Sequence, residues 1–159
     1  DSLALYIGGS EEAFADMMNE RALALGATNT HFVNSHGLTN PEHYTCSYDL
    51  YLMFNALLAY PEFLEIIQTP TRTIEYMSAD GSLNTKNAKT TNQYVNGAVS
   101  QPSQVAVIGG KTGSTNAAGK CIILYTRSGA GKPYIVVVMG AENPEKLYET
   151  VNRLCNDVI

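Results

Sequence analysis

The sequence predicts an α+β fold in which helices come first and an antiparallel sheet with a closing C-terminal helix follows. Apolar residues recur at helical spacing over residues 10–25 and 47–58. The last third changes to short β-branched runs. The 159 residues therefore predict one domain with three parts, namely a mainly helical part (1–70), a connecting segment (71–101) and the sheet with its closing helix (102–159).

The helices are predicted from their caps and apolar stripes. Ser10 supplies a capping hydroxyl before two acids, and Gly26 ends that helix. Its stripe consists of Phe14, Met17, Met18, Ala22 and Leu25. Thr45 or Ser47 is expected to cap the next helix, and residues 62–68 form a short third one. Residues 1–7 have an apolar face but no cap in front, so we expect the natural chain to begin upstream.

The sheet is predicted from short runs of β-branched and aromatic residues. Residues 105–108, 119–126 and 134–139 form its strands, and the last two are joined by a hairpin at 128–133. Residues 71–77 form one more strand, whereas the Asn- and Thr-rich stretch 78–101 is predicted to be mostly a loop. A loop of that length suggests a functional wall or lid. Pro144 begins the final helix.

Composition excludes several classes of protein. The net charge is −5 and no three basic residues are consecutive, which argues against nucleic acid as a partner. No apolar run approaches the roughly 20 residues that span a bilayer. The three cysteines Cys46, Cys121 and Cys155 cannot form a fully paired disulfide framework. No signal peptide opens the sequence, so an export signal is expected to be removed or to lie outside it.

The richest local motif is the run GGKTGST at residues 109–115. A phosphate loop would need a glycine where Val105 stands, and it would need a helix after it, whereas a strand is predicted there. The other interpretation is the Lys-Thr-Gly element of serine acyl-transferases. In that element a lysine and a hydroxyl bind a substrate carboxylate, and a glycine lets the backbone come close.

The surrounding residues extend this motif. The run from Gly110 to Cys121 resembles the Lys-Thr-Gly-x-Thr-x-x-Ala-Gly-x-Cys signature of the D-alanyl-D-alanine carboxypeptidases, the low-molecular-mass penicillin-binding proteins. Further stretches in the same chain order are similar to that family, namely residues 14–26, 30–38 and 43–50. The resemblance covers nearly the whole chain.

The resemblance implies a part of the transpeptidase-like (β-lactamase-like) fold and a serine-type D-Ala-D-Ala carboxypeptidase as the parent protein. Such an enzyme removes the terminal D-alanine of peptidoglycan stem peptides through an acyl-enzyme, and β-lactams react with the same serine. It uses no metal and no organic cofactor. It belongs to the extracytoplasmic bacterial envelope, periplasmic or at the cell surface. Whether a membrane anchor lies outside these 159 residues is left open by the sequence.

Carried over residue by residue, the resemblance assigns the candidate site to Lys111, Thr112, Gly113 and Ser114. Lys111 and Thr112 would bind the terminal carboxylate, Gly113 would permit close approach, and the Ser114 N–H would be an oxyanion donor. We expect Lys111 at the mouth of a groove, with Thr112 or Ser114 facing the same space.

The departures from the family pattern concern the nucleophile. No serine has a lysine three residues later, so the Ser-x-x-Lys motif is absent from these 159 residues. Ser82-Leu83-Asn84 matches the second motif, Ser-x-Asn, only literally, because in the family that motif would precede Asp1, so we interpret Ser82 as a turn residue. Residues 84–87 partly resemble an Asn-Thr-Asn stretch. A class A β-lactamase fits less well, since no glutamate-bearing deacylation loop is found.

Other polar residues have simpler explanations. His31, His36, His43 and Cys46 lie close in sequence, but their spacing matches no standard zinc pattern, and structural hydrogen bonding in a loop explains them better. Asp49 is interpreted as a first-turn acid that complements a helix dipole.

We therefore expect a C-terminal segment of a D-Ala-D-Ala carboxypeptidase that is inactive as 159 residues because it lacks the nucleophile. The alternative is a non-catalytic module that binds D-alanyl carboxylates of peptidoglycan peptides. Residues 134–139 are almost continuously apolar, and the resemblance implies that N-terminal strands pair with them. Without those strands, we expect self-association or a retained N-terminal piece at this edge.

Overall fold

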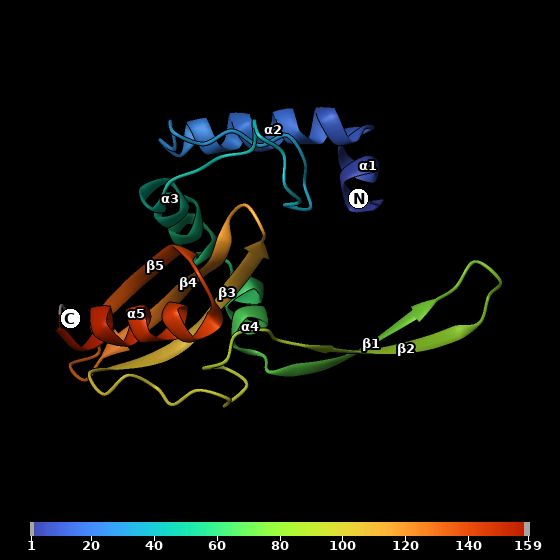
Figure 1. Cartoon of the computed structure of the whole chain (residues 1–159). Helices are drawn as coiled ribbons and strands as arrows, with labels where there is room; N and C mark the ends of the chain where they lie inside the picture. Colours follow the sequence, from blue (N-terminus) through green and yellow to red (C-terminus); the bar gives the residue numbers. More distant parts are fainter. Residues whose placement is uncertain (1, 158–159) are drawn as a thin grey trace.

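The computed structural model describes residues 2–157, which form five helices and five strands (Figure 1). The helices are α1 (Ser2–Gly8), α2 (Glu11–Ala24), α3 (Ser47–Leu57), α4 (Pro61–Gln68) and α5 (Pro144–Asp157). The strands are β1 (Thr71–Met77), β2 (Leu83–Lys89), β3 (Val105–Thr115), β4 (Gly119–Ser128) and β5 (Pro133–Ala141). The predicted order of helices, antiparallel sheet and closing helix is confirmed.

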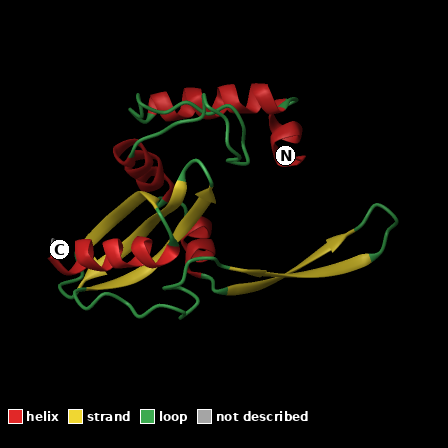
Figure 2. Ribbon diagram, in the orientation of Figure 1, coloured by secondary structure: helices red, strands yellow, loops and turns green. Residues whose placement is uncertain are grey.

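The body of the molecule is a three-stranded antiparallel sheet in the order β3-β4-β5, with helices on both faces (Figure 2). On one face α5 covers Val105, Val107, Leu124, Val136 and Val138, which form the larger core cluster. On the other face α3 and α4 pack against the sheet through a smaller cluster. The alternation of side chains along each strand thus supplies two apolar faces from one sheet.

Helix α2 begins at its predicted start signal, and its apolar stripe is only partly buried. The Ser10 hydroxyl accepts a hydrogen bond from the Ala13 N–H at 3.0 Å, as an N-cap does. The expected stripe on α2, however, lines an open apolar groove of about 530 Å³ between α2 and α3 rather than a closed core. Met17, for example, stays 47% exposed.

The region between residues 71 and 101 differs most from the prediction. Leu83–Lys89 forms strand β2, which pairs antiparallel with β1 from Thr71↔Lys89 to Met77↔Leu83. The two strands make an arm that extends away from the body (Figure 1). Every residue of β1 is exposed. The loop prediction for 83–89 was wrong because this strand is held by backbone pairing and buries neither face.

Smaller differences concern the ends of elements. Cys46, rather than Thr45 or Ser47, occupies the N-cap of α3, and its side chain makes no capping hydrogen bond. Strand β3 continues to Thr115, so the Lys-Thr-Gly run lies inside a strand. Among the described residues no single helix is long and apolar enough to cross a membrane, and α3 and α4 reach that length only together, across a 114° bend.

Candidate active site

The Lys-Thr-Gly run lies in the second half of β3, directly after two glycines that let other elements come close. A Cβ on Gly109 would lie 2.6 Å from the Ile67 carbonyl oxygen of α4, and a Cβ on Gly110 would overlap the Ile123 carbonyl oxygen of β4. Both positions therefore require glycine. The β3–β4 register also shifts between Val107 and Gly109, which marks a β-bulge just before the motif.

The bulge and the strand alternation decide which way each candidate side chain points. Lys111 pairs with Ile123, which belongs to the cluster under α4, whereas Thr112 pairs with Ile122, which belongs to the cluster under α5. Cross-strand partners point to the same face of a sheet. Lys111 therefore points to the α4 face, and Thr112 and Ser114 point to the α5 face.

Two cavities around β3 lie on these two faces of the sheet, one on each. Lys111 lines a cavity of about 590 Å³ that is bounded by α4 and the base of the β1–β2 arm. Thr112 and Ser114 line a smaller cavity of about 120 Å³ beside α5. Lys111 therefore lines a cavity beside β3, and its role as a carboxylate-binding residue stays a prediction. The prediction that Thr112 or Ser114 faces the same space was wrong, because successive residues of a strand point to opposite faces.

The two cavities share one residue, Thr91, which sequence reasoning missed. The hydroxyl of Thr91 forms a hydrogen bond with the hydroxyl of Thr112. In the part of the chain that the structure describes, β3 is an edge strand, and Thr91 contacts it at Thr112. Thr91 therefore completes the site as a second hydroxyl next to the motif.

Helix α5 holds the segment that carries Thr91 in place. The Tyr148 hydroxyl accepts a hydrogen bond from the Gln93 N–H at 2.8 Å, and the Tyr94 hydroxyl donates to Asn152 Oδ1 at 2.8 Å. The rings of Tyr94 and Tyr148 meet edge to face at 4.9 Å. Burial raises the pKa of both phenols, so they stay protonated.

The other expected motif residues lie away from Lys111. Residues 84–87, which partly resemble an Asn-Thr-Asn stretch, lie on β2 in the arm. Ser82 lies in the turn between β1 and β2, where its N–H and hydroxyl both donate to Asp80 Oδ1, at 2.9 and 2.7 Å. The interpretation of Ser82 as a turn residue is confirmed.

The histidine-containing loop forms its own hydrogen-bond network. His31 Nδ1 lies 2.6 Å from the Glu42 carbonyl oxygen, and His36 Nδ1 accepts from the Leu38 N–H at 3.2 Å. Burial, together with His31 and His36, lowers the pKa of His43, which favours the neutral ring that accepts from the Val33 N–H. Within residues 2–157 no three His, Cys, Asp or Glu side chains gather as a metal site.

Asp49 joins this loop to α3 and does more than complement a helix dipole. It is fully buried, and its Oδ2 accepts from the Asn29 N–H and the Thr30 hydroxyl, both at 2.7 Å. Burial would raise the pKa of Asp49, but these hydrogen bonds outweigh it and hold the pKa below the ordinary 3.8. The charged carboxylate thus anchors the loop.

Comparison with known proteins gives the family. Residues 2–143 match the family described as D-alanyl-D-alanine carboxypeptidase. The D-alanyl-D-alanine carboxypeptidases DacF of Bacillus subtilis and DacD of Escherichia coli are 33% and 32% identical over 96% of this chain. The crystal structure of a Streptomyces DD-transpeptidase covers 88% of this chain and 52% of its own, with 28% identity and a TM-score of 0.75.

This chain therefore belongs to the D-alanyl-D-alanine carboxypeptidase family, and the resemblance expected from the Lys-Thr-Gly signature is confirmed. The described residues have part of the transpeptidase fold found in penicillin-binding proteins, so the fold class is confirmed as well. The chain spans 36% of the length of these two curated relatives, about a third.

Proposed function

We propose that this chain is a part of a serine-type D-Ala-D-Ala carboxypeptidase and that β3 binds the terminal carboxylate of its peptide substrate. The observation that supports this most is the Lys-Thr-Gly run on an edge strand, with Lys111 open to a cavity and Thr112 next to a second hydroxyl. A peptide can lie along the unpaired edge of such a strand.

Each residue then has a defined role. The Thr112 and Thr91 hydroxyls can donate to the terminal carboxylate because each can turn toward a ligand. Lys111 points to the other face of the sheet, but its ammonium reaches the Thr112 carbonyl oxygen and Thr91 lines both cavities, so Lys111 supplies positive charge at the same carboxylate. Gly113 bears no side chain that would hold the peptide away, and a Cβ there would meet no atom within 4 Å in the unliganded site. The Ser114 N–H stabilises the negative charge that develops on the carbonyl oxygen of the penultimate D-alanine.

The nucleophile is proposed to come from residues outside these 159. Its serine attacks the penultimate D-alanine carbonyl, the peptide C–N bond breaks, and D-alanine leaves with the proton that its amine needs. Water then hydrolyses the acyl-enzyme and restores the serine. A β-lactam acylates the same serine, so the proposed ligands are peptidoglycan stem peptides and penicillins.

The place of action is proposed to be the bacterial envelope, periplasmic or at the cell surface. Peptidoglycan lies outside the cytoplasmic membrane, and an enzyme that trims its stem peptides acts there. The net charge of −5 and the scattered basic residues agree with a peptide rather than a nucleic acid as the ligand.

A non-catalytic D-alanyl-carboxylate module is the second candidate, because no serine of this chain has a lysine three residues later. The protein expressed from its complete reading frame separates the two. The enzyme hypothesis predicts an upstream Ser-x-x-Lys and release of D-alanine from a stem pentapeptide. A start codon near Asp1, with binding of the pentapeptide but no release, would overturn it and favour the module.

A further inference from the structure

We propose that the cavity beside Lys111 is a second carboxylate subsite, for a leaving residue with an acidic side chain. The inference rests on the proposed function, since it uses Lys111 as the partner of the substrate's terminal carboxylate. It adds a subsite made by Arg72 and Lys89, which are far from the motif in sequence. The ligand class is a peptide that ends in D-alanyl-D-glutamate or a similar acidic residue.

The order of residues along β3 places the cavity on the leaving-group side. The Ser114 N–H marks the scissile carbonyl, and the terminal carboxylate lies toward Thr112 and Lys111, whose ammonium reaches back to the Thr112 carbonyl oxygen. The cavity is lined by Lys111 and Gly110, which is the next residue away from Ser114. A separate cavity, lined by Thr115 and Ala117, lies at the opposite end of the motif. The cavity beside Lys111 therefore begins where the terminal carboxylate of the substrate ends.

The size of the cavity allows more than a single alanine. Its volume of about 590 Å³ lies within the roughly 300–1,000 Å³ of sites that hold drug-sized molecules. Its apolar part is formed by Ile66, Ile67 and Ile74. An aliphatic stem with a charged end would fit a surface of this kind.

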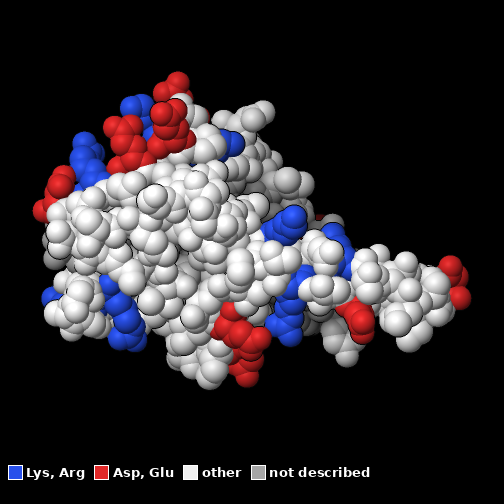
Figure 3. Space-filling model, turned by 90° about the horizontal axis from the view of Figure 1, so that it is seen from below, with Lys and Arg blue, Asp and Glu red and all other residues white. Residues whose placement is uncertain are grey.

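The charges that line the cavity have one sign. Arg72 from β1, Lys89 from the end of β2 and Lys111 from β3 all line it, and no acidic residue does. Lysine and arginine side chains gather where the arm leaves the body, with acidic side chains nearby but outside the cavity lining (Figure 3). The whole chain has a net charge of −5, whereas the charged residues that line this cavity are all positive. Such a surface attracts a carboxylate more strongly than a neutral side chain.

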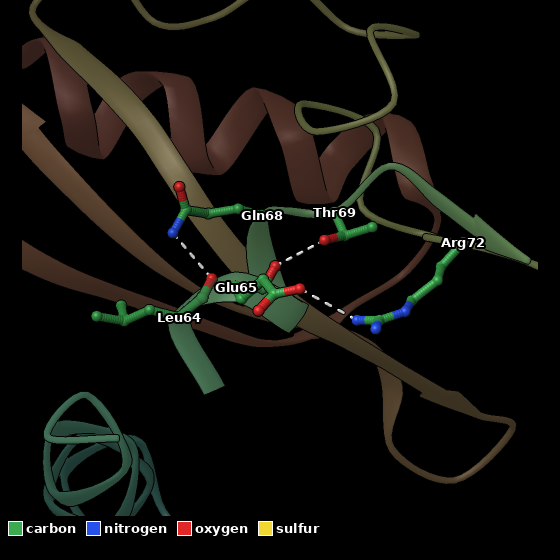
Figure 4. A network of polar contacts seen from close by, with 5 residues as sticks. All are labelled: Leu64, Glu65, Gln68, Thr69 and Arg72. Carbon is green, nitrogen blue, oxygen red and sulfur yellow. Dashed lines mark hydrogen bonds and ion pairs between the residues drawn. The ribbon is translucent and has the colours of Figure 1, made fainter. Parts of the chain in front are cut away.

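The chain just before Arg72 is held by hydrogen bonds, while the Arg72 side chain remains available to a ligand. Gln68 and Thr69 donate to the carbonyl oxygens of Leu64 and Glu65, which fixes the junction from α4 to β1 (Figure 4). Arg72 Nη1 lies 3.2 Å from Glu65 Oε1, and these side chains are 61% and 69% exposed. An exposed ion pair of this kind contributes little. The guanidinium has five N–H donors, so it can bind a second carboxylate.

The test uses the 159-residue chain and two probes, N-acetyl-D-Ala-D-Ala and N-acetyl-D-Ala-D-Glu, titrated by NMR. We expect the D-Glu probe to bind up to about fivefold tighter at low salt, the upper range for exposed charge pairs. The double variant Arg72→Gln/Lys89→Gln should remove that preference and leave the affinity for D-Ala-D-Ala unchanged. Lys146→Gln, on α5 at the other face of the sheet, is the matched control.

The outcomes separate the subsite from the proposed function. If the original chain binds both probes with equal affinity, and Lys111→Gln weakens the binding of D-Ala-D-Ala, the subsite alone is overturned. A D-Glu preference that survives the double variant would do the same. If neither probe binds, the carboxylate site of the proposed function fails together with the subsite.

Discussion

Lys111 is the residue on which the proposed carboxylate site depends most, since it brings positive charge to the cavity at the edge of β3. In the protein expressed from its complete reading frame, we predict that Lys111→Ala lowers kcat/KM for D-Ala-D-Ala peptides by about 10- to 100-fold. That range corresponds to the loss of one hydrogen bond to a charged group. A D-alanine release assay measures it.

The control for this prediction is Lys146→Ala, because Lys146 is exposed on α5 and pairs with Glu149. It should leave the kinetics unchanged. Equal kinetics for Lys111→Ala and the original protein would mean that the Lys-Thr-Gly run does not bind substrate.

Asp49 gives a prediction on pH and stability. Its folded pKa lies below the ordinary 3.8, so its contribution is fully present above that value and is lost as the pH falls through the folded pKa. We predict that Asp49→Asn lowers the Tm by a few degrees at pH 7 and that the variant loses less Tm than the original chain between about pH 5 and 2.

Asp16→Asn is the matched control, since Asp16 is exposed on α2 and its side chain makes no hydrogen bond with the described residues. It should keep the pH dependence of the original chain. Parallel curves of Tm against pH for Asp49→Asn and the original chain would show that protonation of the buried carboxylate does not change the stability of the fold.

At the scale of elements, α5 supports the site by fixing the segment that carries Thr91. We predict that Tyr148→Phe destabilises the chain by about 1 kcal/mol, because the Gln93 N–H loses its acceptor. Amide exchange at Gln93 and its neighbours should become faster, whereas exchange in β4 should change only with global stability.

Tyr134→Phe on β5 controls for the loss of a hydroxyl, since the Tyr134 hydroxyl makes no hydrogen bond with the described residues. Unfolding curves and exchange rates that match for Tyr148→Phe and Tyr134→Phe would show that α5 does not hold the segment.

The elements that the sequence predicts well are those that bury at least one face. The periodicity of α5 and the β-branched runs of β4 and β5 could be read directly, because burial selects apolar residues at fixed spacing. Strand β2 (LNTKNAK) could not, since it lies in an exposed arm and no burial constrains its residues. Its pairing with β1 depends on backbone hydrogen bonds, which leave little trace in composition.

The candidate site was also predictable only in part from the sequence. The Lys-Thr-Gly run has a spacing of its own, so Lys111 could be placed from the sequence. Thr91 could not, because its place beside Thr112 depends on contacts between residues 55 positions apart, Gln93 and Tyr148. The bulge between Val107 and Gly109, which no motif reveals, decides that Lys111 points to the α4 face and Thr112 to the α5 face.

At the scale of the whole molecule, β5 lies at the edge of the sheet formed by the described residues. Its inward residues Val136 and Val138 pack under α5, while Val137 lies in the cluster under α3 and α4. An apolar edge strand with unpaired backbone groups is a template for another strand. We predict that the 159-residue chain dimerises or exchanges elements through residues 134–139, or copurifies with an N-terminal piece.

Light scattering over a dilution series measures this association. Met139→Lys, at an exposed position of β5, should shift the chain toward monomer because an edge charge discourages strand pairing. A monomer that persists at all concentrations, without a copurifying peptide, would contradict the prediction.

We propose that these 159 residues supply the substrate-binding strand of a serine acyl-transferase whose nucleophile lies elsewhere in the natural protein. Intact mass spectrometry after incubation with benzylpenicillin tests it most directly. We expect one covalent adduct on the protein from the complete reading frame, at a serine upstream of Asp1, and none on the 159-residue chain. No adduct on the complete protein, or an adduct on the short chain that Ser82→Ala removes, would contradict it.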